Sequence, residues 1–127
     1  MRTAINAAII QDKKLLLVKK NETWILPGGK PELGEEDLEC LCREIDEELS
    51  GTRIKNISYY KFFDGQTPHK KDLLRAKVYF AEIYGQLNGV RKEDSISEVE
   101  FVNNFSNYKL SDITSKIVHS LQQDKYL

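Results

Sequence analysis

The sequence holds few of the features that mark disulfide-stapled, membrane-spanning or polyanion-binding proteins. Its two cysteines, Cys40 and Cys42, are two positions apart in a helical pattern and would point to different sides, so we expect no disulfide between them. The 19 Lys and Arg against 20 Asp and Glu give a net charge of −1, which supplies no overall positive field for a nucleic-acid polymer or a membrane. No run reaches the roughly 18 apolar residues of a membrane span, and no signal-peptide pattern is present. We therefore expect a cytoplasmic protein with neither partner.

The rest of the composition is that of a folded globular chain. Hydrophobic residues make up 40% and charged residues 31% of the 127 positions, and no repeat or linker interrupts them, so we expect one domain over residues 1–127. Apolar runs and alternating patterns predict strands at Ala4–Ile10, Leu15–Val18, Trp24–Leu26, Tyr59–Phe63, Leu74–Phe80 and Val99–Val102. Polar loops are predicted at Asp64–Lys71 and Gly85–Asp94. With the two helices described next, this order predicts an α/β sandwich with a mixed sheet.

Two segments have helical periodicity. From about Glu35 to Leu49 an apolar stripe is predicted to face the core, formed by Leu38, Leu41, Cys42, Ile45 and Leu49. Near the end of the chain Ser111 is a candidate N-cap for a helix whose apolar residues recur every four positions, at Ile113, Ile117 and Leu121.

The first helix also carries three crowded carboxylates. Glu44 is three residues from Glu47 and four from Glu48, so like charges lie side by side on one flank, each pair costing about 0.2–0.5 kcal/mol. They occupy the C-terminal half of the helix, where the dipole disfavours negative charge. A bound cation would explain both departures, and hard carboxylate oxygens suit Mg²⁺ or Mn²⁺, which gather the oxygens of a diphosphate.

The spacing around these glutamates extends the pattern. Gly29 is followed after five residues by Glu35, and after seven more by the run Arg43-Glu44-Ile45-Asp46-Glu47-Glu48. This resembles the signature of the Nudix hydrolases, and the preceding Leu26-Pro27-Gly28-Gly29-Lys30 is also typical of that family. The resemblance implies a Nudix-like α/β/α sandwich over essentially the whole sequence. One departure is that Ser50 occupies the family's glycine position and Gly51 follows one residue late, so we expect an irregular helix end.

The resemblance implies a role for each residue of the motif. Glu44, Glu47 and Glu48 are the expected metal ligands, and Glu47 or Glu48 is also expected to orient or deprotonate the attacking water. Arg43 and Glu35 are expected to join the loop to the helix through charge-assisted hydrogen bonds. Further family glutamates come from a later loop, where the candidates for a ligand or general base are Glu93 and Glu98.

Candidate substrate contacts are less sharply defined. Gly28 and Gly29 would let the backbone approach the metal or a phosphate closely. The cations that could contact phosphate are Lys19, Lys20, Lys30 and Arg75. Five aromatic residues could stack on a base, but as strand residues they are more readily explained as core: Tyr59, Tyr60, Phe62, Phe63 and Phe101. His119 is interpreted as an ordinary helix residue, and His69 lies in a loop where family members build specificity.

The implied activity is metal-dependent hydrolysis of a diphosphate linkage in a small nucleotide. The short chain favours a nucleoside triphosphate, including an oxidised deoxynucleoside triphosphate. Hydrolysis of ADP-ribose or a nucleotide sugar is the alternative, for which Pro68 is a weak hint. A Nudix module that senses nucleotides without cleaving them is a third reading, disfavoured by the three intact glutamates. The resemblance also allows a homodimer.

Overall fold

The computed structural model describes residues 2–66, 72–87 and 96–127. Within these ranges the chain forms eight strands and two helices. In chain order they are β1 (Arg2–Ala8), β2 (Ile10–Gln11), β3 (Lys14–Lys20), β4 (Thr23–Ile25), β5 (Gly28–Gly29), α1 (Asp37–Glu48), β6 (Thr52–Gln66), β7 (Leu73–Gly85), β8 (Ile96–Val102) and α2 (Asp112–Gln123).

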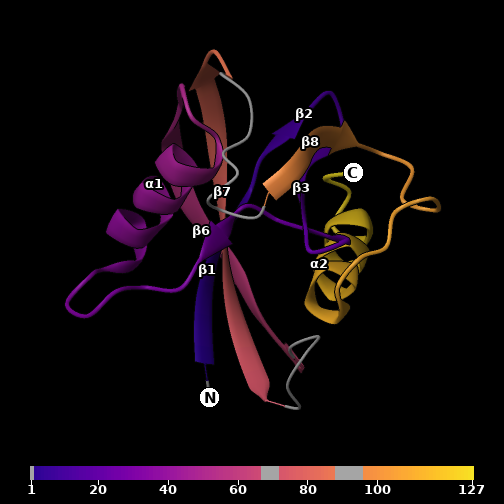
Figure 1. The fold of residues 1–127 in the computed structure, drawn as a ribbon. Helices are drawn as coiled ribbons and strands as arrows, with labels where there is room; N and C mark the ends of the chain where they lie inside the picture. Colours follow the sequence, from indigo (N-terminus) through magenta and orange to yellow (C-terminus); the bar gives the residue numbers. More distant parts are fainter. Residues whose placement is uncertain (1, 67–71, 88–95) are drawn as a thin grey trace.

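The strands form two sheets. The first has the order β5-β1-β7-β6 and is mixed, because β1 runs parallel to β7 while the other pairs are antiparallel. The second joins β2, β3 and β4, with β8 also pairing with β3, all antiparallel. Helices α1 and α2 lie on opposite sides of the strands (Figure 1). This arrangement confirms the predicted α/β/α sandwich with a mixed sheet.

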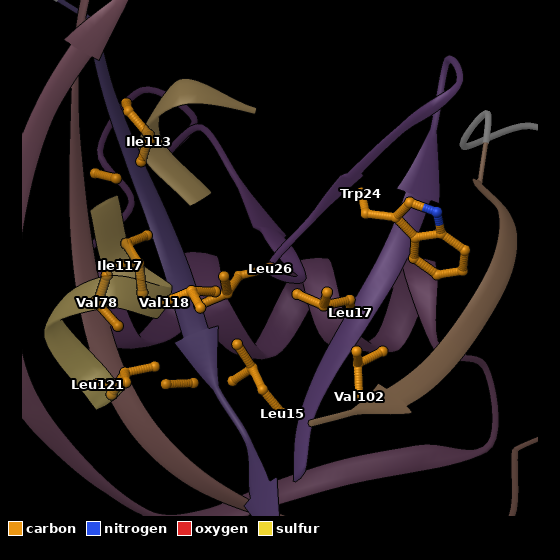
Figure 2. Packing of buried hydrophobic residues seen from close by; sticks show 12 residues of the cluster. Leu15, Leu17, Trp24, Leu26, Val78, Val102, Ile113, Ile117, Val118 and Leu121 are labelled. Atoms are coloured by element: carbon orange, nitrogen blue, oxygen red, sulfur yellow. The ribbon is translucent and has the colours of Figure 1, made fainter. Parts of the chain in front are cut away.

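Two apolar clusters hold the layers together. One lies under α1 and includes Ile5, Leu41 and Ile45. The other lies under α2, where Ile117 and Leu121 pack toward strand residues, as Figure 2 shows. Alternation along β1 feeds both clusters, because successive side chains of a strand point to opposite faces of the sheet. The first sheet therefore buries apolar residues on both faces.

Helix α2 follows its sequence prediction closely. The Ser111 side chain accepts a hydrogen bond from the backbone N–H of Thr114 at 3.1 Å, as an N-cap does. The predicted apolar positions Ile113, Ile117 and Leu121 are all buried. His119 is an exposed helix residue, as interpreted from the sequence. In the described part of the chain, neither helix is long and apolar enough to cross a bilayer.

The predicted apolar stripe of helix α1 is only partly right, because Leu41, Ile45 and Leu49 are buried but the other two positions are not. Leu38 is 47% exposed and Cys42 is also exposed, whereas Cys40 and Glu48 are buried beside Leu41 and Ile45. The buried face is thus rotated toward the carboxylates. The helix packs on β5 as well as on β1 and β6 of the same sheet, and the contact with β5 needs a small side chain and a hydrogen-bond acceptor rather than a leucine.

The end of α1 is irregular, as expected. The helix ends at Glu48, and the last i to i−4 hydrogen bond runs from the Leu49 N–H to the Ile45 carbonyl at 2.8 Å. Gly51 has φ of +92°, so the late glycine takes the left-handed conformation that closes the turn.

Several strand predictions need correction. β6 continues to Gln66 and β7 to Gly85, so each strand ends inside a segment predicted as a loop. The reason is that the two strands pair with each other along nearly their whole length. The prediction that the five aromatic residues belong to the core is right for two of them, because Tyr60 and Phe63 pack against it. Three of the five are exposed instead, at 51%, 50% and 37%: Tyr59, Phe62 and Phe101. Pro68, His69 and Glu93 lie outside the described residues.

Candidate active site

The site is built around the tight turn at Pro27–Gly29. Gly28 has φ of +143°, and a Cβ there would lie 2.1 Å from the Ile5 carbonyl oxygen, because β5 pairs closely with β1. The Gly28 N–H donates to Glu48 Oε1 at 2.8 Å. Glu48 is only 2% exposed. A buried carboxylate on α1 therefore fixes the glycine turn against the helix.

Gly29 makes room for a second carboxylate. A Cβ at Gly29 would lie 2.4 Å from both Cδ and Oε1 of Glu44. The Gly29 carbonyl faces the same helix, where the Cys40 thiol donates to it at 3.7 Å. The absence of a side chain at Gly29 is what allows the Glu44 carboxylate to lie against the turn.

Arg43 joins the loop before α1 to the helix. Its Nε and Nη2 donate to the two oxygens of Glu35 at 2.7 and 2.9 Å, a two-pronged ion pair. This guanidinium is the main reason that the pKa of Glu35 falls to about 2. Nη2 also donates to the Lys30 carbonyl at 3.2 Å. Arg43 and Glu35 therefore join the loop to the helix through charge-assisted hydrogen bonds, as the family resemblance implied.

The same guanidinium faces the carboxylate flank. Nη1 of Arg43 lies 3.0 Å from Glu44 Oε1 and 3.4 Å from both oxygens of Glu47. Burial raises the pKa of Glu44, and the contact with Arg43 only partly opposes that rise. Glu32 lies 3.7 Å from Nε of Arg43, so four carboxylates, of Glu32, Glu35, Glu44 and Glu47, surround one guanidinium. The group carries excess negative charge if all four are ionised.

These carboxylates fit a divalent cation in their chemistry. Oxygens of Glu44, Glu47 and Glu48 are hard donors on one helix, and the space kept open by Gly29 lies beside one of them. In the ranges that the structure describes, however, no three acidic, His or Cys side chains converge as a ready metal cluster. Glu48 is turned to Gly28, while Glu44 and Glu47 lean toward Arg43.

A cavity of about 510 Å³ opens beside this cluster. Gly28, Gly29 and Glu44 form one wall, and Lys20 stands at the end of β3. The remaining walls come from β1, β7 and the first turns of α2, largely through Ala4, Ala76, Ile113 and Ile117. The volume lies within the range of pockets for small ligands, about 300–1,000 Å³.

The other candidate residues lie elsewhere. Lys19 forms an ion pair with Glu98 of β8 at 3.2 Å, so these two candidates face each other. Arg75 donates to Asp64 at 2.8 and 3.0 Å on the first sheet. Lys30 does line the cavity. The structure therefore brings together Gly28, Gly29, Lys30, Arg43, Glu44, Glu47 and Glu48 and places Lys19, Glu98 and Arg75 in separate pairs.

Two residues that line the cavity, Lys20 and Asn6, are not distinguished by the sequence pattern. The sequence offers Lys20 only as one of four cations, but Lys20 lines the cavity, and its charge partly opposes the rise that burial causes in the pKa of Glu44. Asn6 was overlooked inside the apolar run Ala4–Ile10. Its polarity within that run was the available signal, because a buried polar side chain in a strand needs partners.

Comparison with known proteins agrees with this geometry. A family model for the NUDIX domain matches residues 1–113. The chain belongs to the Nudix family. The Nudix-type pyrophosphohydrolase activity predicted from the motif is confirmed as the enzyme class. No curated protein matches the chain.

Solved Nudix structures share the fold. A MutT Nudix hydrolase from Burkholderia pseudomallei is 26% identical, with 93% of this chain and 95% of that one covered and a TM-score of 0.80. A Nudix hydrolase from Nitrosomonas europaea has a TM-score of 0.81 at 15% identity, covering 98% and 90%. A UDP-X diphosphatase has a TM-score of 0.76 at 23% identity, covering 97% of this chain and 63% of that one. Nudix hydrolases generally use a divalent metal ion.

Proposed function

We propose that this Nudix enzyme hydrolyses a diphosphate linkage in a nucleoside triphosphate, including oxidised deoxynucleoside triphosphates. The observation that carries the proposal is that Glu44, one of the three crowded carboxylates of α1, lines a nucleotide-sized cavity together with its partner Arg43. A substrate can place its phosphates at Gly28 and Gly29 and its nucleoside between the first sheet and α2. The apolar residues of α2 and β7 suit the flat faces of a base.

Glu44, Glu47 and Glu48 would hold Mg²⁺ or Mn²⁺. The bound ion would supply charge neutralisation and a lowered pKa for water. Around it, Arg43 holds Glu44 at the cavity wall and also contacts Glu47, and Glu48 holds the glycine turn. Glu47 is half exposed, so it can reach a water molecule and accept its proton as the oxygen attacks phosphorus.

Lys20 is the cation best placed to bind a phosphate of the substrate. It lines the cavity beside Glu44, whereas Lys19 is paired with Glu98. Positive charge at this position offsets repulsion between a polyanionic substrate and the carboxylates. Glu93 and Glu98 are kept as candidates for a further ligand or base.

A second candidate is a pyrophosphatase for ADP-ribose or a nucleotide sugar. A further hollow of about 830 Å³ adjoins the cavity and shares Asn21, Thr23, Gln66 and Ser111 with it. This continuity would accept a substrate with a second sugar beyond the diphosphate.

We further propose that residues 1–127 act as one domain in the cytoplasm, and a homodimer is the assembly to test for.

A substrate panel with Mg²⁺ or Mn²⁺ tests the proposal. The panel contains nucleoside triphosphates, 8-oxo-dGTP, ADP-ribose, dinucleotides and nucleotide sugars. We expect metal-dependent turnover of triphosphates, reduced at least 100-fold in Glu47→Gln or Glu48→Gln. Asp46→Asn is the matched control, because Asp46 is an exposed acid immediately before Glu47 on the same helix.

The outcomes separate the alternatives. Preferred turnover of ADP-ribose or a nucleotide sugar would establish the second candidate. Binding of nucleotides without cleavage of any panel member would favour a sensing module. Turnover that survives both glutamate substitutions would refute the assigned site.

A further inference from the structure

Asn6 is the polar side chain of β1 that lines the cavity, and its environment fixes the orientation of its amide. β1 alternates, so Ala4 and Asn6 both line the α2 side of the first sheet. Ala4 is small and apolar, and its neighbour Ala76 on β7 is the same. Among the residues that β1 and β7 contribute to the cavity lining, Asn6 is therefore the one polar side chain.

The nitrogen of this carboxamide is committed to the protein. Asn6 Nδ2 donates to the Leu26 carbonyl at 3.2 Å and reaches the Pro27 carbonyl at 3.5 Å. Both neighbours are acceptors, so the amide cannot be flipped without facing oxygen against oxygen. Oδ1 is consequently held on the other branch of the planar group, and among the described residues it accepts no hydrogen bond from the protein.

We propose that Asn6 Oδ1 is a specificity-determining acceptor for the nucleoside part of the substrate. The group it recognises is a hydrogen-bond donor, either an exocyclic amino group of the base or a hydroxyl of the sugar. Because the amide is already held in its orientation, it does not have to reorient when the ligand binds. A ligand that lacks the donor leaves Oδ1 desolvated and without a hydrogen bond. This role rests on the proposed nucleotide substrate and deepens it.

The competing explanation is purely structural. Asn6 pairs with Gly28 across β1 and β5, and its amide ties down the carbonyls just before the glycine turn. A structural role would weaken every ligand to the same degree when Asn6 is replaced. A recognition role changes the ratio between two ligands that differ in one donor.

The test measures dissociation constants of nucleoside 5′-monophosphates by calorimetry with Mg²⁺ present. The ligand pairs are adenosine against purine riboside, guanosine against inosine, and adenosine against its 2′-deoxy and 3′-deoxy forms. The wild type is expected to prefer the donor-bearing member of one pair by about tenfold. In Asn6→Ala that preference disappears while the ratios of the other pairs stay within about twofold.

Asn6→Ser provides a second variant if Asn6→Ala fails to fold. Its hydroxyl can still donate toward the Leu26 carbonyl, but the amide oxygen Oδ1 is gone and the shorter side chain does not replace it. Asn107→Ala is the matched control, since Asn107 is exposed and is not among the residues that line the cavity.

Three results would overturn the assignment. They are equal affinity of the wild type for both members of every pair, no measurable binding of any monophosphate, and affinity ratios of the pairs that are unchanged by both Asn6 substitutions. A preference that Asn6 controls, in a protein that cleaves no nucleotide, would support the assignment and refute the proposed function. Cleavage of triphosphates by a protein whose affinity ratios do not depend on Asn6 would support the proposed function and refute the assignment of Asn6.

Discussion

Replacing the two glycines of the turn one at a time should separate stability from activity. At Gly28 a Cβ would meet the backbone oxygen of Ile5 at 2.1 Å, and φ of +143° is strained for any residue with a side chain. The oxygen belongs to a paired strand and cannot move freely. Backbone strain of about 1–3 kcal/mol and overpacking of about 1–3 kcal/mol add to a loss of about 2–6 kcal/mol for Gly28→Ala.

Gly29→Ala meets a different obstacle. The nearest atoms are the carboxylate atoms of Glu44, at 2.4 Å, at the end of a flexible side chain. A shift of about 1 Å restores ordinary contact, at a cost we expect to be below about 1 kcal/mol. The same shift moves a proposed metal ligand, and misplacement by about 1 Å can reduce the rate by about 100-fold.

Thermal unfolding and initial hydrolysis rates measure the two effects. For a chain of this length 1 kcal/mol corresponds to about 4 °C in Tm. Gly28→Ala should therefore lower Tm by roughly 8–24 °C, and Gly29→Ala by less than about 4 °C while kcat falls by about 100-fold. A Gly29→Ala protein with wild-type kcat, or one as unstable as Gly28→Ala, would refute the assigned contact with Glu44.

Three further predictions follow from single side chains. Lys20→Ala should raise KM for a triphosphate by about tenfold and Lys19→Ala by less than about twofold, because only the first lines the cavity; equal effects would contradict this. The pKa of Glu35 is lowered from 4.5 to about 2, so its contribution to stability is present above about pH 4.5 and is lost as pH falls through 2. Urea unfolding should show Glu35→Gln less stable than the wild type at pH 7, with the gap closing toward pH 2; a constant gap would count against it. Thiol labelling at pH 8 should modify exposed Cys42 rapidly and Cys40 slowly, since burial raises the pKa of Cys40 to about 11; equal rates would be inconsistent with the buried thiol.

The features of the site that could be predicted from the sequence are the local ones. The spacing from Gly29 to Glu48 lies within one turn and one helix, so residue types and helical geometry determine which side chains are neighbours. The pairing of Arg43 with Glu35 could be anticipated for the same reason. The cavity could not, because its walls come from β1, β3, β7 and α2, and their approach depends on a parallel pairing that no local pattern reveals.

The orientation of α1 shows why the positions of apolar residues alone do not predict which face of this helix is buried. Leu38 and Cys42 satisfy the helical stripe, yet both are exposed, and Glu48 takes a buried position instead. The Gly28 N–H explains this exchange. A buried backbone donor requires an acceptor, and leaving it unpaired costs about 1–3 kcal/mol, comparable to burying one apolar side chain. The helix therefore presents to β5 the face that satisfies the turn.

Two polar side chains within apolar segments fix the position of the glycine turn. Glu48 lies on the buried face of a helix and Asn6 on a strand within an apolar run, and each bonds to the backbone beside the same glycine turn. Glu48 accepts from the turn, and Asn6 donates to the carbonyls just before it. Together they hold Pro27–Gly29 from opposite sides, which keeps Gly29 open against Glu44 and the cavity open beside it. The glycines permit the turn, but these two polar side chains determine where it lies relative to the carboxylates.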